Sequence, residues 1–279
     1  MLKKIVKAPY VKGDPLQLVD FLALKSGLSK AKLKEAMVKG AVWIKGKKRK
    51  GNFRVRRATA ELRNGDIVEL YYDEKILSVP EIEITELQRG RGWIAYFKPA
   101  GVLSQGTKYG DHISLLRHVE KKERESFLIH RLDREASGVM IVATNKKMAT
   151  DLSRQFAENK TVKIYRAIIE GEIESLGKKG TIDLPLEGKE ARTDYQILKT
   201  KGNRALVEIL LHTGRTHQIR KHFSMKNCPL YGDVEYGPYR GQHYDLPLVA
   251  HSLTFFDLGT KKPVTVEVSS DHALIEIPD

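Results

Sequence analysis

Residues 127–144 read FLIHRLDREASGVMIVAT, a polar turn between two apolar runs. The runs at residues 127–130 and 138–144 are rich in aliphatic and β-branched residues, which predicts two strands. Ser137 and Gly138 are typical residues for closing the turn between them. Because so many polar residues are difficult to place in a core, we expect this turn to present a reactive side chain on a rigid frame.

One carboxylate of this turn, Asp133, lies between two arginines, Arg131 and Arg134. Nearby guanidinium groups favour the ionised carboxylate, as a nucleophile or general base requires, and they also attract an anionic substrate. A structural salt bridge is the plainer interpretation of an Arg-x-Asp pattern. The turn by itself leaves both interpretations open.

A second polar cluster, TGRTHQIR at residues 213–220, follows a predicted strand at residues 205–211. A helix that starts at Thr216 would place His217 and Arg220 on one face, which could point into a site. Arg220 is then a charge partner for a carboxylate. A third feature, KIYRA at residues 163–167, starts another strand, in which a tyrosine is more often ordinary core.

The sequence lacks the usual signs of metal and cofactor chemistry. Its single cysteine, Cys228, excludes an intrachain disulfide and every multi-cysteine zinc motif, and we expect a buried apolar role for it. His212, His217 and His222 do not have the spacing of zinc ligands. P-loop, GxGxxG, HExxH and GxSxG motifs are also missing from the sequence. We therefore expect no metal site and no cofactor.

The body of the chain predicts an α+β fold. The clearest helix spans residues 145–159 and has Asn145 as its N-cap. Strands connected by long irregular segments, without regular βαβ alternation, predict a mixed, mostly antiparallel sheet. Residues 73–90 resemble a connector that adds an edge strand. Further strands are expected at residues 93–97, 162–171, 205–211 and 264–268.

Positive charge is concentrated in the first quarter of the chain. The net charge is +14 over 279 residues, from 49 Lys and Arg against 35 Asp and Glu. Residues 1–70 hold 18 of the basic and 6 of the acidic residues, an excess of 12. This step in charge predicts a small basic module at residues 1–72, a linker at 73–90 and a body at 91–279 that is large enough to bury a core.

The basic module reads as two short helices and a hairpin. Leu18, Phe21 and Leu22 give the first helix an apolar face, and Gly27 ends it. The second helix has Ser29 as its N-cap and Gly40 as its left-handed C-terminal cap. Strands are expected at residues 41–44 and 67–70.

Lysines crowd the first turns of that second helix, at Lys30, Lys32 and Lys34. They oppose the positive end of the helix dipole and repel one another, and a bound polyanion would relieve both penalties. The alternative is a merely solvated charged face. We call the remaining cations of the module the basic rim, which is suited to phosphate contacts and consists of Lys45, Lys47, Lys48, Arg49, Lys50, Arg54, Arg56 and Arg57.

Taken in order, these motifs resemble the RluA family of RNA pseudouridine synthases. The resemblance rests on HRLD with Ser137 and Gly138, on Lys163-x-Tyr165-x-Ala167 and on GRTHQIR, and it spans residues 91 to about 270. Residues 98–101 (KPAG) and 232–237 (GDVEYG) match further family segments, whereas Ala136 departs from the usual Thr. The basic module resembles an S4-type (alpha-L) RNA-binding domain, an arrangement seen in the ribosomal RNA-modifying branch.

The resemblance implies a pseudouridine synthase fold and a role for each site residue. Asp133 would be the nucleophile, Arg220 would pair with it, and Tyr165 would lie against the base and help the final proton removal. Arg131 would take the place of the flipped uridine in the stack. Leu132 and Ile219 would form the pocket wall, and the remaining contacts to RNA would come from His130, Arg134, Arg215 and His217.

The partner implied is RNA, with ribosomal RNA of the large subunit first and transfer RNA second. Two alternatives remain, a non-catalytic RNA chaperone or ribosome-assembly factor on the same fold, and a hydrolase that uses Asp133 with His130 or His217. No apolar run is long enough to cross a bilayer and no signal core follows Met1, so we expect a cytoplasmic protein without membrane contact. A monomer is the default expectation.

Overall fold

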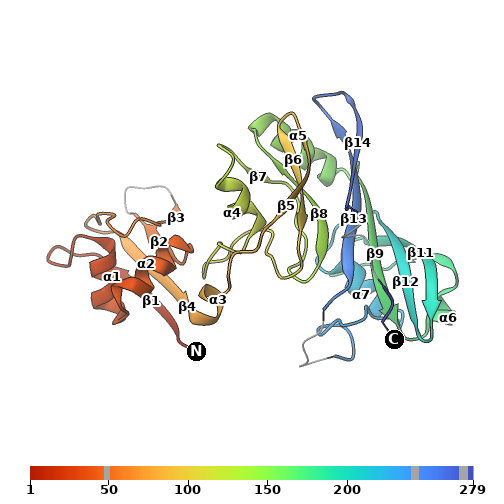
Figure 1. Cartoon of the computed structure of the whole chain (residues 1–279), viewed down its shortest axis with the longest axis horizontal. Helices are drawn as coiled ribbons and strands as arrows, with labels where there is room; N and C mark the ends of the chain where they lie inside the picture. The colour runs from red at the N-terminus through yellow and green to blue at the C-terminus, as the bar shows by residue number, and fades with distance from the viewer. Residues whose placement is uncertain (47–50, 240–244, 270–275, 279) are drawn as a thin grey trace. The chain divides into compact units, whose positions relative to one another are not determined.

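The computed structural model places the chain in two compact units (Figure 1). Unit 1 comprises Met1–Glu83 and Gln105–Lys121, and unit 2 comprises Ile84–Ser104 and Lys122–Asp279. The chain therefore passes between the units three times. The division at residues 72 and 90 stays a prediction, to which the structure adds that the segment 105–121 packs within unit 1. The residues described are 1–46, 51–239, 245–269 and 276–278.

In unit 1, the described residues form a four-stranded antiparallel sheet with helices packed against it. The strand order is β1-β4-β2-β3. Alternate residues of the sheet, such as Val42, Ile44, Val68 and Leu70, face a core that they share with the helices. The elements are β1 (Lys3–Pro9), α1 (Leu18–Ser26), α2 (Lys30–Val38), β2 (Val42–Lys45), β3 (Asn52–Arg54), β4 (Ile67–Asp73), α3 (Glu74–Leu77) and α4 (Leu115–Glu120).

The predicted helix ends of unit 1 are confirmed. Gly27 follows α1 with a left-handed φ of 67°, and the Ser29 hydroxyl accepts a hydrogen bond from the backbone N–H of Lys32. Gly40 follows α2 with a φ of 84°, and a Cβ there would lie 2.4 Å from Oδ1 of Asp111. A side chain at this position would therefore be excluded by strain and by space.

Unit 2 is built on a larger sheet, in which ten strands form part of the described structure. Its main path runs β10-β11-β12-β9-β13-β8-β6-β5, while β14 pairs with β13 and β7 pairs with β8. The strands are β5 (Thr85–Gly90), β6 (Trp93–Lys98), β7 (Phe127–Leu128), β8 (Ser137–Ala143), β9 (Val162–Glu170), β10 (Lys179–Asp183), β11 (Arg192–Lys201), β12 (Arg204–Leu211), β13 (Leu248–Asp257) and β14 (Lys262–Glu267).

This sheet confirms the predicted α+β class with a mixed, mostly antiparallel sheet. The pairing of β13 with β8 is parallel, whereas the other strand pairs described are antiparallel. The linker contributes β5, which lies at one end of the strand order, as expected of an edge strand. No helix among the described residues is long and apolar enough to span a membrane.

Within its described residues, unit 2 also has three helices, α5 (Lys146–Ala157), α6 (Ile173–Leu176) and α7 (Gln218–Ser224). Met148 and Leu152 of α5 share one buried cluster with β6, β8 and β13. Ile219 and Phe223 of α7 share another with β9, β11 and β12, which also holds Cys228 in the buried apolar role that we expected. The polar turn at residues 129–136 leads into β8, and β8 and β9 both pair with β13, at the centre of the sheet.

Gly138 fixes the point at which this turn enters the sheet. Its φ is 121°, and a Cβ would lie 2.3 Å from the carbonyl oxygen of Ala250, its partner in the parallel β13–β8 pairing. Only glycine permits both the backbone conformation and the close approach of the two strands. The turn that carries Asp133 is thereby held at a defined position against β13.

Candidate active site

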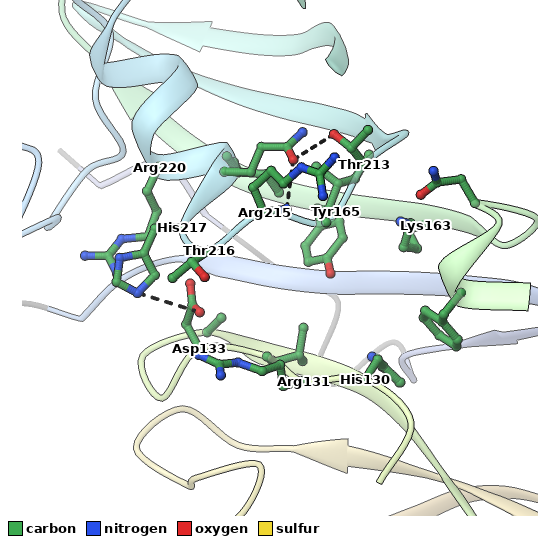
Figure 2. Close-up of a pocket in the computed structure, with 18 of the residues that line it drawn as sticks. His130, Arg131, Asp133, Lys163, Tyr165, Thr213, Arg215, Thr216, His217 and Arg220 are labelled. Atoms are coloured by element: carbon green, nitrogen blue, oxygen red, sulfur yellow. Dashed lines mark hydrogen bonds and ion pairs between the residues drawn. The ribbon is translucent and has the colours of Figure 1, made fainter. Parts of the chain in front are cut away.

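A cavity of about 580 Å³ in unit 2 brings most of the predicted site residues together (Figure 2). The turn before β8, the strand β9, the helix α5 and the loop that leads into α7 form its walls. The predicted residues that line it are His130, Arg131, Leu132, Asp133, Tyr165, Arg215, His217, Ile219 and Arg220. His130 and Arg220, which are 90 residues apart in the sequence, thus converge on one site.

Residues 98–104 make hydrogen bonds to the backbone of both residues that flank Asp133, Leu132 and Arg134. The Ser104 hydroxyl accepts a hydrogen bond from Leu132 N–H at 3.0 Å and donates one to the Leu132 carbonyl at 2.7 Å. Gly101 N–H donates to the Arg134 carbonyl at 2.7 Å, and Lys98 Nζ reaches the same oxygen at 3.4 Å. The KPAG motif is therefore a brace for the loop and does not line the cavity.

Lys98 is fully buried within this brace. Its ammonium group donates to the carbonyls of Pro99 at 2.9 Å and of Val102 at 2.8 Å. Burial lowers the pKa of Lys98 to about 8, while the charges of Glu135 and Asp133 act in the opposite direction. The carbonyl contacts satisfy the cation without placing a carboxylate beside it.

Arg220 projects from α7 into the same cavity, but it is paired differently from our expectation. Its guanidinium makes two hydrogen bonds of 2.7 Å to Asp233, and it contacts Glu235 at 3.3 Å. The expected direct pairing with Asp133 is therefore wrong for this structure, because Nε and Nη2 bond Asp233, although the charge of Asp133 still acts on Arg220 through space. The bidentate geometry suits the planar guanidinium group.

Arg220 and Asp233 form a buried ion pair, with side-chain exposures of 3% and 0%. Burial alone would raise the pKa of Asp233, but the hydrogen bonds from Arg220 and from two backbone N–H groups hold this pKa below its usual range. Those N–H groups belong to Glu235 and Tyr236, each 3.0 Å from Oδ1 of Asp233. The GDVEYG segment thus forms a turn whose Asp233 carboxylate binds the Arg220 guanidinium of α7.

His217 lies directly before α7, as its N-cap, with a φ of 54°. The helix begins at Gln218, two residues later than Thr216, so His217 and Arg220 do not share a helix face as we had considered. Its ring lies between two carboxylates. Nε2 is 3.7 Å from Asp133 (Figure 2), and Nδ1 is 3.3 Å from Glu235. Nδ1 is also 2.9 Å from the Tyr236 hydroxyl.

A left-handed conformation at a non-glycine residue costs about 1–2 kcal/mol, so the surrounding contacts must hold His217 in place. The ring of Tyr236 contacts it edge-on at 5.6 Å between centroids. This links two motifs, because Tyr236 belongs to the turn that Asp233 organises. The contacts of Tyr236, in the turn that Asp233 organises, consequently hold the His217 ring in the orientation in which it faces Asp133.

Gln218 is a site residue that we did not predict. It is 2% exposed, and its Oε1 accepts hydrogen bonds from the Thr213 hydroxyl at 2.8 Å and from Arg215 N–H at 3.0 Å. Its Nε2 donates to the Arg192 carbonyl at 3.1 Å and to Thr193 Oγ1 at 3.0 Å. Gln218 therefore fixes the loop before α7. Its place in the GRTHQIR motif, at the first residue of α7, was the signal available in the sequence.

Tyr165 lies on β9 and faces the cavity between Asp133 and Lys163 (Figure 2). Burial and, to a smaller extent, the charge of Asp133 raise the pKa of its hydroxyl. Tyr165 therefore stays protonated at neutral pH and presents a neutral ring and a hydrogen-bond donor. The neutral phenol weighs against the part in the final proton removal that the resemblance implied for Tyr165, because a phenolate is disfavoured at this position.

His130 forms part of the cavity wall. Its Nε2 accepts a hydrogen bond from Ile141 N–H at 3.0 Å, and its ring stacks on Phe156 at 4.5 Å with an interplanar angle of 12°. Burial, together with the charge of Lys163, lowers its pKa to about 3. His130 is therefore neutral at physiological pH, and with Nε2 occupied it is unsuited to act as the base of a hydrolase.

The remaining predicted residues lie outside the cavity. Arg134 is exposed on the turn, and Lys34 is exposed on α2. Lys30 pairs with Asp20 at 2.6 Å and Lys32 with Glu74 at 3.1 Å, so local carboxylates already offset part of the repulsion that we had assigned to a polyanion. Lys47 and Lys48 lie outside the described residues, as do Arg49 and Lys50.

Two arginines of the basic rim are engaged within unit 1. Arg54 and Arg56 both donate to Asp111, whose side chain is 4% exposed. Arg54 also donates to the Gly40 carbonyl at 2.9 Å, and Arg56 donates to the Val38 carbonyl at 2.8 Å. These contacts join the segment 105–121 to the end of α2. The rim that faces solvent is correspondingly smaller than the sequence suggested.

Within the described residues, no group of three His, Cys, Asp or Glu side chains is placed to hold a metal ion. The charged groups of the cavity instead pair with one another or face its interior. One carboxylate, two imidazoles, arginines and a neutral tyrosine around a single cavity can bind an anionic substrate and carry out nucleophilic or acid–base chemistry.

The chain is similar in sequence and in fold to known enzymes. Residues 92–225 match the family described as RNA pseudouridylate synthase. An uncharacterized RNA pseudouridine synthase of Aquifex aeolicus is 32% identical over 259 residues, covering 81% of this chain and 78% of that protein. Ribosomal large subunit pseudouridine synthase D of Borreliella burgdorferi is 30% identical over 238 residues, covering 74% and 72%.

A solved structure shares the fold. Human RNA pseudouridylate synthase domain containing 1 superposes with a TM-score of 0.57 at 24% identity, over 67% of this chain and 84% of that one. At this identity the likeness concerns the fold alone, and it supports the arrangement of the sheet around the cavity.

Proposed function

Because this chain belongs to the RNA pseudouridine synthases, which are isomerases, we propose that it converts uridine to pseudouridine in structured RNA and that large-subunit ribosomal RNA is its substrate. The relative from Borreliella burgdorferi, which bears the name of a ribosomal large subunit enzyme, supports this choice of RNA. Transfer RNA is the second candidate. A non-catalytic chaperone on the same fold would not require a reactive carboxylate in such a cavity.

The reaction moves one bond. The glycosidic bond between C1′ and N1 of uridine breaks, the uracil turns, and a carbon–carbon bond forms between C1′ and C5. N1 gains a proton and C5 loses one, so the atoms and electrons balance without an oxidant or a reductant. The chain must therefore supply a nucleophile or base, a cavity for the detached uracil and a path for one proton.

We assign Asp133 as the reacting carboxylate, and its position carries the proposal. Its side chain is 19% exposed inside the cavity, so a ligand can reach it, while its loop is braced by Ser104 and Gly101. Attack on the sugar, attack on the pyrimidine ring and assistance to the departing base all fit this geometry. His217 would orient one carboxylate oxygen and leave the other for the reaction.

The neighbouring residues have complementary proposed roles. A neutral Tyr165 would pack against the flipped uracil and donate a hydrogen bond, and Leu132 and Ile219 would supply the apolar wall. A stacked uridine is out of reach, and extruding it costs a few kcal/mol. Arg131, exposed on the turn next to Asp133, would fill the vacated place in the stack.

We further propose that the helix pair of unit 1 is an S4-type RNA-binding domain. Support comes from the capped helices α1 and α2 and from the excess of 12 positive charges in residues 1–70. Lys34, Lys45 and Arg57 remain exposed, and they would contact phosphates without reading base identity. The domain would hold RNA while unit 2 performs the chemistry.

The choice of substrate is tested by incubating the purified protein with transcripts of large-subunit ribosomal RNA and, separately, of transfer RNA. We expect pseudouridine, measured by mass spectrometry of nucleosides, in the ribosomal transcript and none in the transfer RNA. If pseudouridine forms only in transfer RNA, the proposal that large-subunit ribosomal RNA is the substrate is overturned. Tight binding without pseudouridine in either RNA would favour the chaperone.

A further inference from the structure

A buried lysine lies in the cavity at a place that the proposed chemistry does not use. Lys163 and Asp133 are on opposite sides of Tyr165 in the view of Figure 2, and all three line the cavity. Phe156 and Ala157 of α5 line the same cavity, as do the polar residues Ser153 and Asn159. Among the described residues that line it, Asp133 is the only carboxylate.

Lys163 is 8% exposed. Among the residues that the structure describes, its ammonium group takes part in no hydrogen bond or ion pair. Burial lowers its pKa, with no acidic neighbour opposing the shift. A buried cation without a partner is costly, so its retention in a cavity points to an anion that arrives with a ligand.

The neighbouring groups of the protein do not supply that anion. His130 is neutral, and its Nε2 is taken by the backbone of Ile141. The C-terminal end of α5 carries at most about half a negative charge. Glu158, which caps that helix, is engaged with Lys160 at 2.6 Å. The ligand must therefore provide the negative charge.

We propose that Lys163 binds a phosphate of the RNA backbone beside the flipped uridine. The proposal rests on the function proposed above, in which the uracil packs against Tyr165. Lys163 and Tyr165 are two residues apart on β9 and both face the cavity, so they are about 7 Å apart along the strand. Because Asp133 reacts at the sugar end of this nucleotide, the phosphate that we assign to Lys163 is one further along the RNA chain, which would continue past Tyr165 on the Lys163 side (Figure 2).

With this phosphate subsite, the two ends of the cavity have different roles. The Asp133 end carries out the chemistry, and the Lys163 end holds the backbone in the conformation that places the base there. Because the contact is to phosphate, it strengthens binding for any base sequence. Its loss should raise KM more than it lowers kcat.

The test compares Lys163→Met and Lys163→Arg with the wild type on a transcript of large-subunit ribosomal RNA. Met has a similar length and removes the buried charge, so this variant should unfold at the wild-type temperature or above it. We expect a Kd about tenfold higher, as for one lost charge-assisted hydrogen bond. The slope of log Kd against log salt should become shallower by about 0.7–0.9, the contribution of one phosphate contact.

Lys163→Arg should keep the wild-type slope, and Lys160→Gln is the matched control. Lys160 is exposed, pairs with Glu158 and does not line the cavity, so its loss should leave both Kd and slope unchanged. A wild-type slope in Lys163→Met would overturn the phosphate subsite. If the wild type forms no pseudouridine but the slope still falls in Lys163→Met, the subsite stands and the proposed function fails.

Discussion

Replacing Asp233 by asparagine should destabilise unit 2 by about 3 kcal/mol and lower its activity. Removing one partner of a buried ion pair costs about 3–5 kcal/mol, because the other charge is left buried and unpaired. The pair with Arg220 meets that condition, with exposures of 3% and 0% and two hydrogen bonds of 2.7 Å. Glu235, which is 51% exposed, would return at most about 1 kcal/mol.

The asparagine side chain can still accept the two backbone hydrogen bonds, so the turn at residues 233–236 should persist in weakened form. For a unit of this size, a loss of about 3 kcal/mol corresponds to a fall in Tm of roughly 6–12 °C. A looser turn releases Tyr236 from His217, which faces Asp133 at 3.7 Å. We therefore expect kcat to fall together with stability.

Unfolding of unit 2 can be followed separately from that of unit 1. Of the two tryptophans, Trp43 lies in unit 1 and Trp93 in unit 2, where it is 1% exposed and donates to Asp257 at 3.0 Å. In a Trp43→Phe background, urea denaturation monitored by fluorescence reports on unit 2 alone. Asp233→Asn should then show the expected loss of unfolding free energy.

Two comparisons make the result decisive. Glu235→Gln changes the exposed neighbour and should alter stability by less than about 1 kcal/mol. Adding Arg220→Met to Asp233→Asn removes the unpaired charge and should restore most of the stability but not the activity. Wild-type stability in Asp233→Asn alone would refute the view that this pair supports the site.

Three further predictions concern other parts of the chain. The pKa of histidine is near 6.5 in the unfolded chain, whereas the pKa of His130 in the folded protein is about 3. The unfolded state therefore binds more protons between these pH values, and the free energy of unfolding should decline as the pH falls through this range. In urea denaturation at several pH values, His130→Gln should make that decline shallower. Asparagine tolerates the left-handed backbone, and His217→Asn should lower kcat about tenfold. If Tyr236 acts through its contact with His217, adding Tyr236→Phe should cause little further loss of kcat. Independent losses in the two variants would contradict the proposed action of Tyr236 through His217. Deleting residues 1–72 removes the partners of the segment 105–121 and should expose it to limited proteolysis, while an uncut segment would show that it folds without unit 1.

The polar turn and the helix caps were predictable because their signals are local. Ser29 and Gly27 act on backbone groups a few residues away, and both are found where the sequence places them. The turn with Asp133 is bounded by two apolar runs, which become β7 and β8. Neighbouring residues determine these features.

The partners of the charged residues were not predictable in the same way. Arg220 could be recognised as a partner for a carboxylate, but which carboxylate depends on how the turn at Asp233 folds back on α7. Similarly, the sequence offers no local reason for Asp111 to bond Arg54 and Arg56, more than 50 residues away. Such pairings follow from tertiary structure, and they changed our interpretation of the basic rim.

Strands with weak alternation were also missed. β11 carries polar residues on both faces near its end and has an irregularity in its pairing at residues 197–199. β13 is buried along most of its length, and its pairing with β9 is irregular at residues 250–252. The period-2 pattern that identifies a half-buried strand is lost in both cases.

Release of the hydrogen at C5 of uridine tests the central claim most directly, because isomerisation requires its loss. Large-subunit ribosomal RNA labelled with tritium at that position would be incubated with the wild type, with Asp133→Asn and with Glu135→Gln, which alters an exposed carboxylate of the same turn. We predict rapid release by the wild type and by Glu135→Gln, and none by Asp133→Asn with an RNA affinity within a few-fold of the wild type. Release by Asp133→Asn at the wild-type rate would contradict the assignment of Asp133 as the reacting carboxylate.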